Sequence, residues 1–463
     1  MLHLDSVKMP VLSEEEDYCF DHTYVSDKCK SLLHSDDPDP VFRHKVLLAI
    51  HKLAIPTWSR VPVASHPTLI IKRISGALTN AVYYIAPPEG FKAIKLLLRI
   101  YGPNAELFIN RLTELENLKR LARHSIGPRL LGEFGNGRFE QYMESTTLTA
   151  ETIRDPICSI YVARRISELH YVIQLTPTEQ YEMPNAWKFS FSWLPLARKN
   201  LQNRRHPLSI TVNFLDAIER DFHNYFQWFT NWSNDKKHWA SLQNVFSHND
   251  TQYGNILQMK TKRRSFKPEN KHHILVPVDF EYAGPNVRAY DIANYFAEWM
   301  ANYHHPTQSH LMDRSRYPNF EARKRFYRAY IEQGAVFHKK LVVEDASELT
   351  SNLPEPLESE INTLVHQLEE AVRAVSPAVN AVWALWGVMQ CEETDDEWED
   401  LSVSSEQDKP DGSSPKADSI NVPPIGSTSF DYINYSMEKF NLFYETSAAL
   451  GLNANNRSTF PYD

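Results

Sequence analysis

The chain has little of what secreted, membrane-spanning or disulfide-rich proteins depend on. Its 463 residues include four cysteines, Cys19, Cys29, Cys158 and Cys391, which form no CxxC pair and are typical of free thiols in a reducing compartment. The longest uncharged run, 374–391, contains proline, asparagine and glutamine and is too short and polar to cross a bilayer. The N-terminus lacks the basic and apolar regions of a secretory signal. We therefore expect a cytoplasmic protein without a transmembrane segment.

Positive charge is not in excess. Aspartate and glutamate number 58 against 49 lysines and arginines, and the net charge of −9 disfavours a general nucleic-acid-binding surface. No internal repeat is evident. The hydrophobic content of 42% is enough to bury the core of two packed lobes or of two to three domains.

The most informative stretch is segment 245–299. It places His248, Asp250 and Asn255 in the pattern H-x-D-x-x-x-x-N, and a later apolar run ends in Asp279. Phosphoryl transfer from ATP needs such a set: one aspartate orients and deprotonates the attacking hydroxyl, while an asparagine and a second aspartate hold Mg²⁺ on the phosphates. The spacing from Asp250 to Asn255 equals that of the kinase catalytic loop. An Asx-rich turn between core strands is the alternative, but three matching residue types favour a kinase.

Strand patterns support this interpretation. Apolar runs 255–257 and 274–278 flank the segment 260–273, which predicts a β-hairpin. Such a hairpin would bring Asp250 and Asp279 to one point.

The N-terminal third has the pattern of a small nucleotide-binding lobe. We expect a mobile acidic tail over residues 1–40 and an N-lobe over 41–143. A strand–turn–strand pattern bends at Gly76 and Asn80, where backbone amides can approach a phosphate, although an ordinary β-turn explains the glycine equally well. The following strand places Lys95 and Arg99 on one face, where a cation would meet the nucleotide phosphates. Solvated charges at a strand rim are the alternative.

Two further elements complete the expected N-lobe. A helix over 104–124 carries Glu114, which could reach back to the strand cation. Two strands around the turn at 135–137 lead to Gln141 and Met143, where a hinge between lobes would expose backbone groups to adenine.

The remainder, 144–463, is expected to form a helical C-lobe. Asp291 is placed as the N-cap of one helix, and Ser376 and Pro377 as the start of another, separate from a helix over 358–375. The acidic, Ser/Pro-rich insert 392–428 has almost no apolar residues and is expected to be disordered. A final helix follows the insert.

At 248–255 and 279–299 the sequence resembles the choline/ethanolamine kinase family, and fungal-type choline kinases are most similar. The segments SGALTNAVY, LLLRIYG, IGPRLLG, EQYM, WALW and FDYINY also match, so the resemblance covers roughly residues 74–445 without the insert. It implies an α+β, bilobal protein-kinase-like fold of the aminoglycoside phosphotransferase type, with a small β-rich N-lobe and a large, mostly helical C-lobe. It also implies transfer of the γ-phosphate of ATP to choline.

The resemblance implies roles for individual residues. Asp250 would be the catalytic base, and Asn255 and Asp279 would hold Mg²⁺. The implied nucleotide contacts are Ser75, Gly76, Asn80, Arg99, Glu114, Gln141, Met143 and Gln252. The implied choline pocket consists of Tyr282, Glu298, Trp299, Tyr303, Trp383, Trp386, Tyr432 and Tyr435.

Physical chemistry independently favours an aromatic pocket for this substrate. A quaternary ammonium has no N–H to donate, so aromatic faces with a nearby carboxylate hold it best. Any single ring is also expected in an ordinary core. The leading prediction is a choline kinase of phosphatidylcholine biosynthesis. An ethanolamine kinase, a catalytically silent nucleotide-binding scaffold and an antibiotic or small-alcohol kinase of the same fold are the alternatives, and a homodimer stays open.

Overall fold

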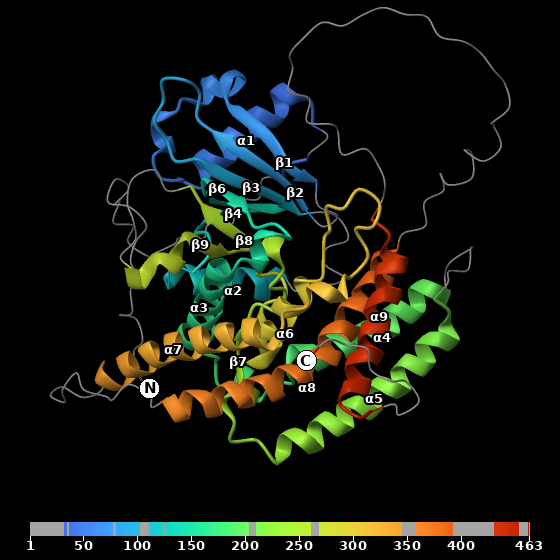
Figure 1. Ribbon diagram of the computed structural model, residues 1–463. Coiled ribbons are helices and arrows are strands. Elements are labelled where there is room, and N and C mark those ends of the chain that lie inside the picture. Colours follow the sequence, from blue (N-terminus) through green and yellow to red (C-terminus); the bar gives the residue numbers. More distant parts are fainter. Residues whose placement is uncertain are drawn as a thin grey trace, which may run out of the picture.

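The computed structural model describes residues 32–34, 37–76, 80–101, 111–124, 126–202, 210–260, 268–344, 358–391, 430–452 and 462. This part of the chain forms a small lobe around a five-stranded sheet and a larger lobe that is mostly helical (Figure 1). The α+β bilobal architecture is therefore confirmed. The insert 392–428, expected to be disordered, lies outside the described residues. Within the described part, none of the helices combines the length and apolarity needed to cross a bilayer.

The small lobe is an antiparallel sheet in the order β1-β2-β3-β5-β4. Its strands are β1 (Ile70–Gly76), β2 (Asn80–Ala86), β3 (Leu96–Tyr101), β4 (Leu130–Phe134) and β5 (Gly137–Gln141). Burial alternates along β3 because successive side chains point to opposite faces. Leu96, Leu98 and Ile100 therefore enter the lobe's core, whereas Arg99 lies on the other face. The strand pairs expected in this region are present, because β1 pairs antiparallel with β2 and β4 with β5, while the connection 77–79 lies outside the described residues.

Part of the stretch expected to be a mobile tail is packed. Leu33 is fully buried in the core of the small lobe. Its N–H donates to Asn136 Oδ1 at 2.9 Å, and Asn136 Nδ2 donates to the Leu33 carbonyl at 2.7 Å. Helix α1 (Asp39–Lys52) begins soon afterwards and adds Val46 and Leu47 to the same core. Burial of apolar side chains, which the acidic composition of the segment obscures, holds these residues in place.

The two lobes meet where β5 runs into a second sheet. That sheet contains β6 (Ser145–Thr147), β8 (Ile256–Met259) and β9 (Leu275–Pro277), in the order β6-β8-β9. The antiparallel pair of β8 and β9, with Ile256 opposite Pro277, confirms the predicted hairpin. Its connection includes the 3₁₀ helix η9 (Pro268–Ile274), while 261–267 lie outside the described residues. A two-stranded sheet pairs β7 (Asn244–Ser247) with β10 (Gly284–Val287).

Helices surround these short strands. They are α2 (Arg111–Arg123), α3 (Pro156–Val172), α4 (Asn185–Gln202), α5 (Val212–Asn234), α6 (Ala289–Glu298), α7 (Phe320–Glu344), α8 (Glu358–Gln390) and α9 (Tyr432–Ala449). Short 3₁₀ helices are η2 (Trp58–Arg60), η3 (Val63–Thr68), η5 (Thr152–Arg154), η6 (Glu179–Tyr181), η7 (Ala240–Leu242), η8 (Tyr253–Asn255) and η10 (Arg314–Arg316). Helix α8 crosses the large lobe beside α9 (Figure 1) and is buried along most of its second half.

The prediction that a new helix starts at Ser376 is wrong, because α8 runs through Pro377 without a break. Proline removes one backbone donor and crowds the carbonyl one turn earlier. Side chains bond the two carbonyls on either side of the one that faces Pro377: Ser376 Oγ donates to the Val372 carbonyl at 2.7 Å, and Tyr225 Oη donates to the Ala374 carbonyl at 2.8 Å. Burial of the surrounding apolar face also favours one continuous helix.

Candidate active site

A short loop after β7 carries the H-x-D-x-x-x-x-N pattern. The backbone N–H of Asp250 donates to His248 Nδ1 at 3.3 Å, so His248 Nε2 carries the proton and donates to the Val278 carbonyl at 2.9 Å. Asn249 between them has φ +66°, in the left-handed region that asparagine tolerates better than most residues. The histidine therefore joins the loop to the strand that leads to Asp279.

Asp250 is held by its neighbours in a buried position. Asn255 Nδ2 donates to Asp250 Oδ2 at 2.7 Å and to the Asp250 carbonyl at 3.2 Å. Gln252 Nε2 lies 3.3 Å from the same Oδ2. Because Asn255 uses its N–H groups on Asp250, its side-chain oxygen is the atom free to act as a metal ligand.

Asp279 reaches the same point from β9. We call the loop 248–255 the catalytic-type loop. The Val278 N–H donates to the Asn255 carbonyl at 2.9 Å, which places Asp279 beside this loop. Asp279 has φ +65°, a strained conformation of the kind found at functional sites. Its carboxylate, 30% exposed, lies 3.4 Å from Arg99 Nη1 of β3. The structure therefore brings together Asp250, Asn255, Asp279 and Arg99, as the sequence predicted.

Carboxyl groups are in excess here. Burial, aided by the charges of Glu298 and Asp279, raises the pKa of Asp250 to about 8. Burial and Asp279 likewise raise the pKa of Glu281 to about 8, and its buried Oε2 has no hydrogen-bond partner among the described residues. A hard divalent cation such as Mg²⁺ would relieve this repulsion, and carboxylate and amide oxygens are the ligands it prefers. The residues therefore fit Mg²⁺.

Arg99 is fixed by a buried charge network in the small lobe. Its Nε lies 3.8 Å from Glu140 Oε1 of the neighbouring strand. Arg138 contacts both Glu140, at 2.5 Å, and Glu114 of α2, at 2.8 Å. The ion pair described for Glu114 is with Arg138. Against the effect of burial, the charges of Asp279 and Glu114 help to raise the pKa of Arg99, so the expectation that Glu114 reaches the strand cation stays a prediction. Antiparallel pairing places Arg138 opposite Arg99 and allows Glu140 to lie near both guanidinium groups.

The other expected nucleotide contacts lie at the edges of this lobe. Ser75 and Gly76 end β1 and Asn80 begins β2, but their side chains are outside the description. Gln141 ends β5, and Met143 lies in the link to β6. Lys95 forms an ion pair with Glu144 next to this link. Of the two cations Lys95 and Arg99, Arg99 is therefore the one that lies next to Asp279.

Rings from four segments form an aromatic cluster near Asp250. Burial, aided by the charge of Asp250, raises the pKa of Tyr282 and of Tyr435. Ring centroids are 5.6 Å apart for Tyr282 and Trp383, and 5.8 Å apart for Trp383 and Trp386. Trp386 is 5.8 Å from Tyr432 and 6.2 Å from Tyr435. We use the name aromatic cluster for the set Tyr282, Tyr303, Trp383, Trp386, Tyr432 and Tyr435.

Close approach of α8 and α9 makes the cluster possible. A Cβ added to Gly387 would lie 2.3 Å from Ser436 Oγ and 3.0 Å from the Tyr435 ring, so only glycine fits there.

The cluster also binds to the catalytic-type loop through hydrogen bonds. Trp383 Nε1 donates to Asn294 Oδ1 at 2.9 Å, and Asn294 Nδ2 donates to Thr251 Oγ1 at 3.2 Å.

Glu298 supplies a carboxylate beside these rings. Tyr303 Oη donates to Glu298 Oε1 at 3.0 Å, while Oε2 is buried without a hydrogen-bond partner in the described part of the chain. Burial raises the pKa of Glu298. Trp299, expected in the same pocket, packs its ring 6.3 Å from that of Tyr295, and its role in the pocket stays a prediction.

Asp291 is the functional residue that the sequence prediction misplaced. It lies in the first turn of α6, after the cap residue Arg288, so the N-cap prediction is wrong. Its buried carboxylate accepts from the backbone N–H groups of His248 at 2.7 Å and Asn249 at 2.8 Å. His170 Nε2 of α3 also lies 3.0 Å away. The position of Asp291 within the segment 279–299 was the signal in the sequence that could have revealed its role. Local capping rules do not reveal a side chain that accepts hydrogen bonds from a distant loop.

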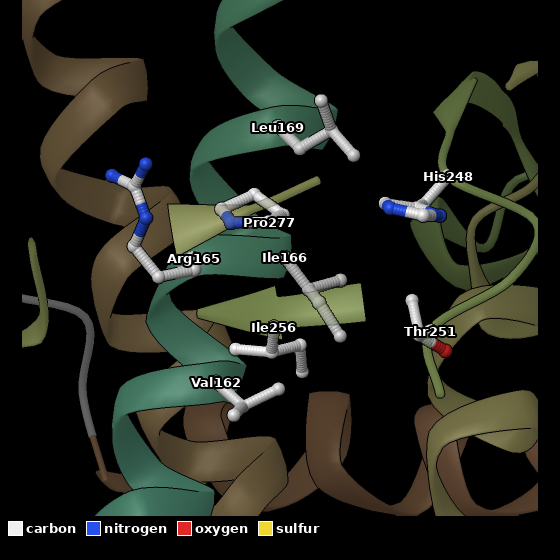
Figure 2. Close-up of a pocket in the computed structure, with 8 residues that line it drawn as sticks. All are labelled: Val162, Arg165, Ile166, Leu169, His248, Thr251, Ile256 and Pro277. Atoms are coloured by element: carbon white, nitrogen blue, oxygen red, sulfur yellow. The ribbon is translucent and has the colours of Figure 1, made fainter. Parts of the chain in front are cut away.

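A small internal cavity of about 20 Å³ lies behind the loop. Figure 2 shows its lining, where side chains of α3 such as Val162 and Ile166 face His248 and Thr251. Its walls are mostly apolar, and the volume is about that of one water-sized probe. The cavity is too small for a nucleotide or an amino alcohol.

Comparison with known proteins agrees with this geometry. Residues 71–444 match the choline/ethanolamine kinase family, and residues 19–64 match the choline kinase N terminus. A choline kinase from Schizosaccharomyces pombe is 61% identical over 97% of this chain and 98% of its own length. An ethanolamine kinase from Saccharomyces cerevisiae is 30% identical over 76% of this chain and 65% of its own.

A solved structure shares the fold. The choline kinase from Cryptosporidium parvum has a TM-score of 0.63 at 20% identity, over 88% of this chain and 97% of its own. The chain belongs to the choline/ethanolamine kinase family.

Proposed function

We propose that this protein transfers the γ-phosphate of ATP to the hydroxyl of choline and releases phosphocholine and ADP. The observation that carries the proposal is that the charges of both Asp279 and Glu298 act on Asp250. Asp279 and Arg99 suit a metal-bound polyphosphate, and Glu298 and the aromatic cluster suit a quaternary ammonium.

The residues divide the reaction as follows. Asp250 accepts the hydroxyl proton of choline while the oxygen forms its bond to the γ-phosphorus and the bond to the β-γ bridging oxygen breaks. Asn255 holds Asp250 in place through its N–H groups. Asn255 and Asp279 would hold Mg²⁺, which neutralises developing phosphate charge when bound. Arg99 would contact the phosphates, with Ser75, Gly76, Asn80 and Gln252 near them. Gln141 and Met143 would meet adenine.

The charge on Asp250 decides when it can act as a base. In the ligand-free protein its pKa is about 8, so most of it is protonated at neutral pH. A metal cation and Arg99 nearby would favour the ionised carboxylate. Binding of nucleotide and metal therefore prepares Asp250 to accept the proton of the choline hydroxyl.

Ethanolamine kinase is the second candidate, and Glu298 is the observation that favours it. A primary ammonium has three N–H donors, and a buried carboxylate with an unoccupied oxygen could accept one. The aromatic cluster favours choline, since ring faces attract a trimethylammonium that cannot donate hydrogen bonds.

Measurement of ADP release with Mg·ATP tests the proposal. Choline, N,N-dimethylethanolamine, N-methylethanolamine and ethanolamine form a series of decreasing methylation. We expect kcat/KM to fall along this series. A rise along the series would support an ethanolamine kinase instead, and no ADP release with any member would support a nucleotide-binding scaffold.

We also propose the cytoplasm as the compartment, because the scattered cysteines suit a reducing environment.

A further inference from the structure

A buried lysine of α9 lies beside the proposed choline pocket. Lys439 is completely shielded from solvent, and its Nζ has no hydrogen-bond partner among the residues that the structure describes. The ammonium lies 5.5 Å from the centroid of the Tyr435 ring and 3.8 Å from Glu298 Oε1. A buried cation without hydrogen bonds is costly, so its position next to an acidic substrate-side residue calls for a functional explanation.

Neighbouring carboxylates are already engaged by another cation. Glu438 accepts from Arg314 Nη1 and from the Met312 N–H, and Glu445 forms a two-point contact with Arg314, including Nη2 to Oε1 at 2.8 Å. Glu298 is therefore the carboxylate within ion-pair distance that Lys439 can neutralise. The pair is too long for a direct hydrogen bond, so any ammonium at Lys439 acts through its charge. Burial lowers the pKa of Lys439, and the charges of Glu298 and Glu438 oppose that shift and favour the ammonium form.

The two amino alcohols would respond differently to this charge. Ethanolamine carries a primary ammonium, which needs hydrogen-bond acceptors when water is removed, and an unneutralised Glu298 would be the strongest acceptor near the rings. Choline carries a trimethylammonium without N–H groups and gains most of its attraction from ring faces. A fixed lysine that neutralises Glu298 therefore weakens the pocket for a primary ammonium more than for a quaternary one.

We propose that Lys439 is a specificity-determining residue that disfavours ethanolamine by neutralising Glu298. The proposal rests on the proposed function, because it assumes that the aromatic cluster and Glu298 receive the substrate ammonium. It assigns selectivity against primary amines to a repulsive element, in addition to the attractive rings. The alternative is that Lys439 only stabilises the packing of α9 against α6.

Replacement of the charge at nearly constant shape tests the proposal. We expect Lys439→Met to lower the ratio of kcat/KM for choline to kcat/KM for ethanolamine by about tenfold, the effect of one hydrogen bond to a charged group. The change should appear chiefly as a lower KM for ethanolamine. Lys439→Arg keeps a cation and should keep the wild-type ratio within a few-fold.

Tyr303→Phe is a matched control, because it removes the other described partner of Glu298 Oε1 without changing any charge. It should change the ratio less than Lys439→Met does. Losses of equal size for both amino alcohols in Lys439→Met, or a ratio that rises, would overturn the proposal and leave a packing role. If Lys439→Met does not fold, Lys439→Gln replaces it, with the same ratio as the criterion.

A binding measurement separates this proposal from the proposed function. Calorimetric titration with tetramethylammonium and methylammonium needs no turnover. Lys439→Met should gain affinity for methylammonium relative to tetramethylammonium, again by about tenfold. A wild-type protein that phosphorylates neither amino alcohol would refute the proposed function, while this titration would still decide the role of Lys439. Equal changes in affinity for both cations would overturn it.

Discussion

Substitution of Asp291 tests how the loop that carries Asp250 is held in place. The Asp291 carboxylate is fully buried and accepts two backbone N–H groups, from His248 at 2.7 Å and from Asn249 at 2.8 Å. A buried donor left without a partner costs about 1–3 kcal/mol, so Asp291→Ala should cost about 2–6 kcal/mol. A domain is typically stable by only about 5–15 kcal/mol, so this variant should be close to unfolding.

Asp291→Asn gives the sharper test because the amide keeps one acceptor oxygen. It can satisfy one of the two N–H groups, so we expect a loss of about 1–3 kcal/mol in the free energy of unfolding. Asn249, with φ +66°, would be released from its strained conformation, and the adjoining Asp250 would shift. We therefore expect kcat to fall by about tenfold or more, since small displacements of a catalytic group are costly.

Urea denaturation and steady-state ADP release measure the two effects. Asp155→Asn is the matched control: Asp155 caps α3 by accepting from the N–H groups of Ile157 and Cys158, at 3.0 and 2.8 Å, and is exposed. The control should lose a little stability and keep the wild-type kcat. Wild-type stability and kcat in Asp291→Asn would refute the reasoning, since both depend on the same two hydrogen bonds.

Four further predictions concern the site itself. Asp250→Asn should fold normally and lower kcat by roughly 10²–10⁴-fold, the usual contribution of a general base; ADP release within a few-fold of wild type would exclude that role. Burial raises the pKa of Asp250 from 3.8 to about 8 and that of Glu281 from 4.5 to about 8. Without metal, their contribution to stability should be complete below about pH 4 and lost as the pH rises through 8; urea titrations at pH 6 and 9 should show this slope, reduced in Asp250→Asn. Mg²⁺ should release protons near pH 7, detectable in weak buffer, and the absence of release would argue against these ligands. Trp386→Ala should raise KM for choline roughly 2- to 30-fold with nearly constant KM for ATP; a loss confined to ATP would mean that Trp386 is structural.

Much of the site could be predicted because its signals are local in the chain. Asp250 and Asn255 lie on one short loop, and two flanking apolar runs with strand periodicity predicted the hairpin that leads to Asp279. Trp383 and Trp386 are three residues apart on a helix, so their shared face follows from helical geometry alone. Turn spacing and side-chain periodicity carry this information without knowledge of distant partners.

Pairings between distant segments could not be predicted in the same way. Glu114 pairs with Arg138, a partner that local rules did not indicate, and Asp291 accepts from the catalytic-type loop, although local rules predicted a helix cap. His272 and His273 lack a metal-type spacing in sequence, yet both lie within hydrogen-bond distance of buried Glu168 of α3. Which polar groups meet depends on how whole elements pack, and propensity does not encode that.

By itself, the sequence determined the chemistry of the protein: a kinase-type set of oxygen ligands, a strand cation and aromatic residues at helical spacing. Tertiary structure decided which of these residues share a site. It carried α8 through Pro377 and set Lys439 against Glu298. The physical reason is that residue types and spacing act over one or two turns, whereas burial forces distant polar groups to find partners wherever packing leaves them.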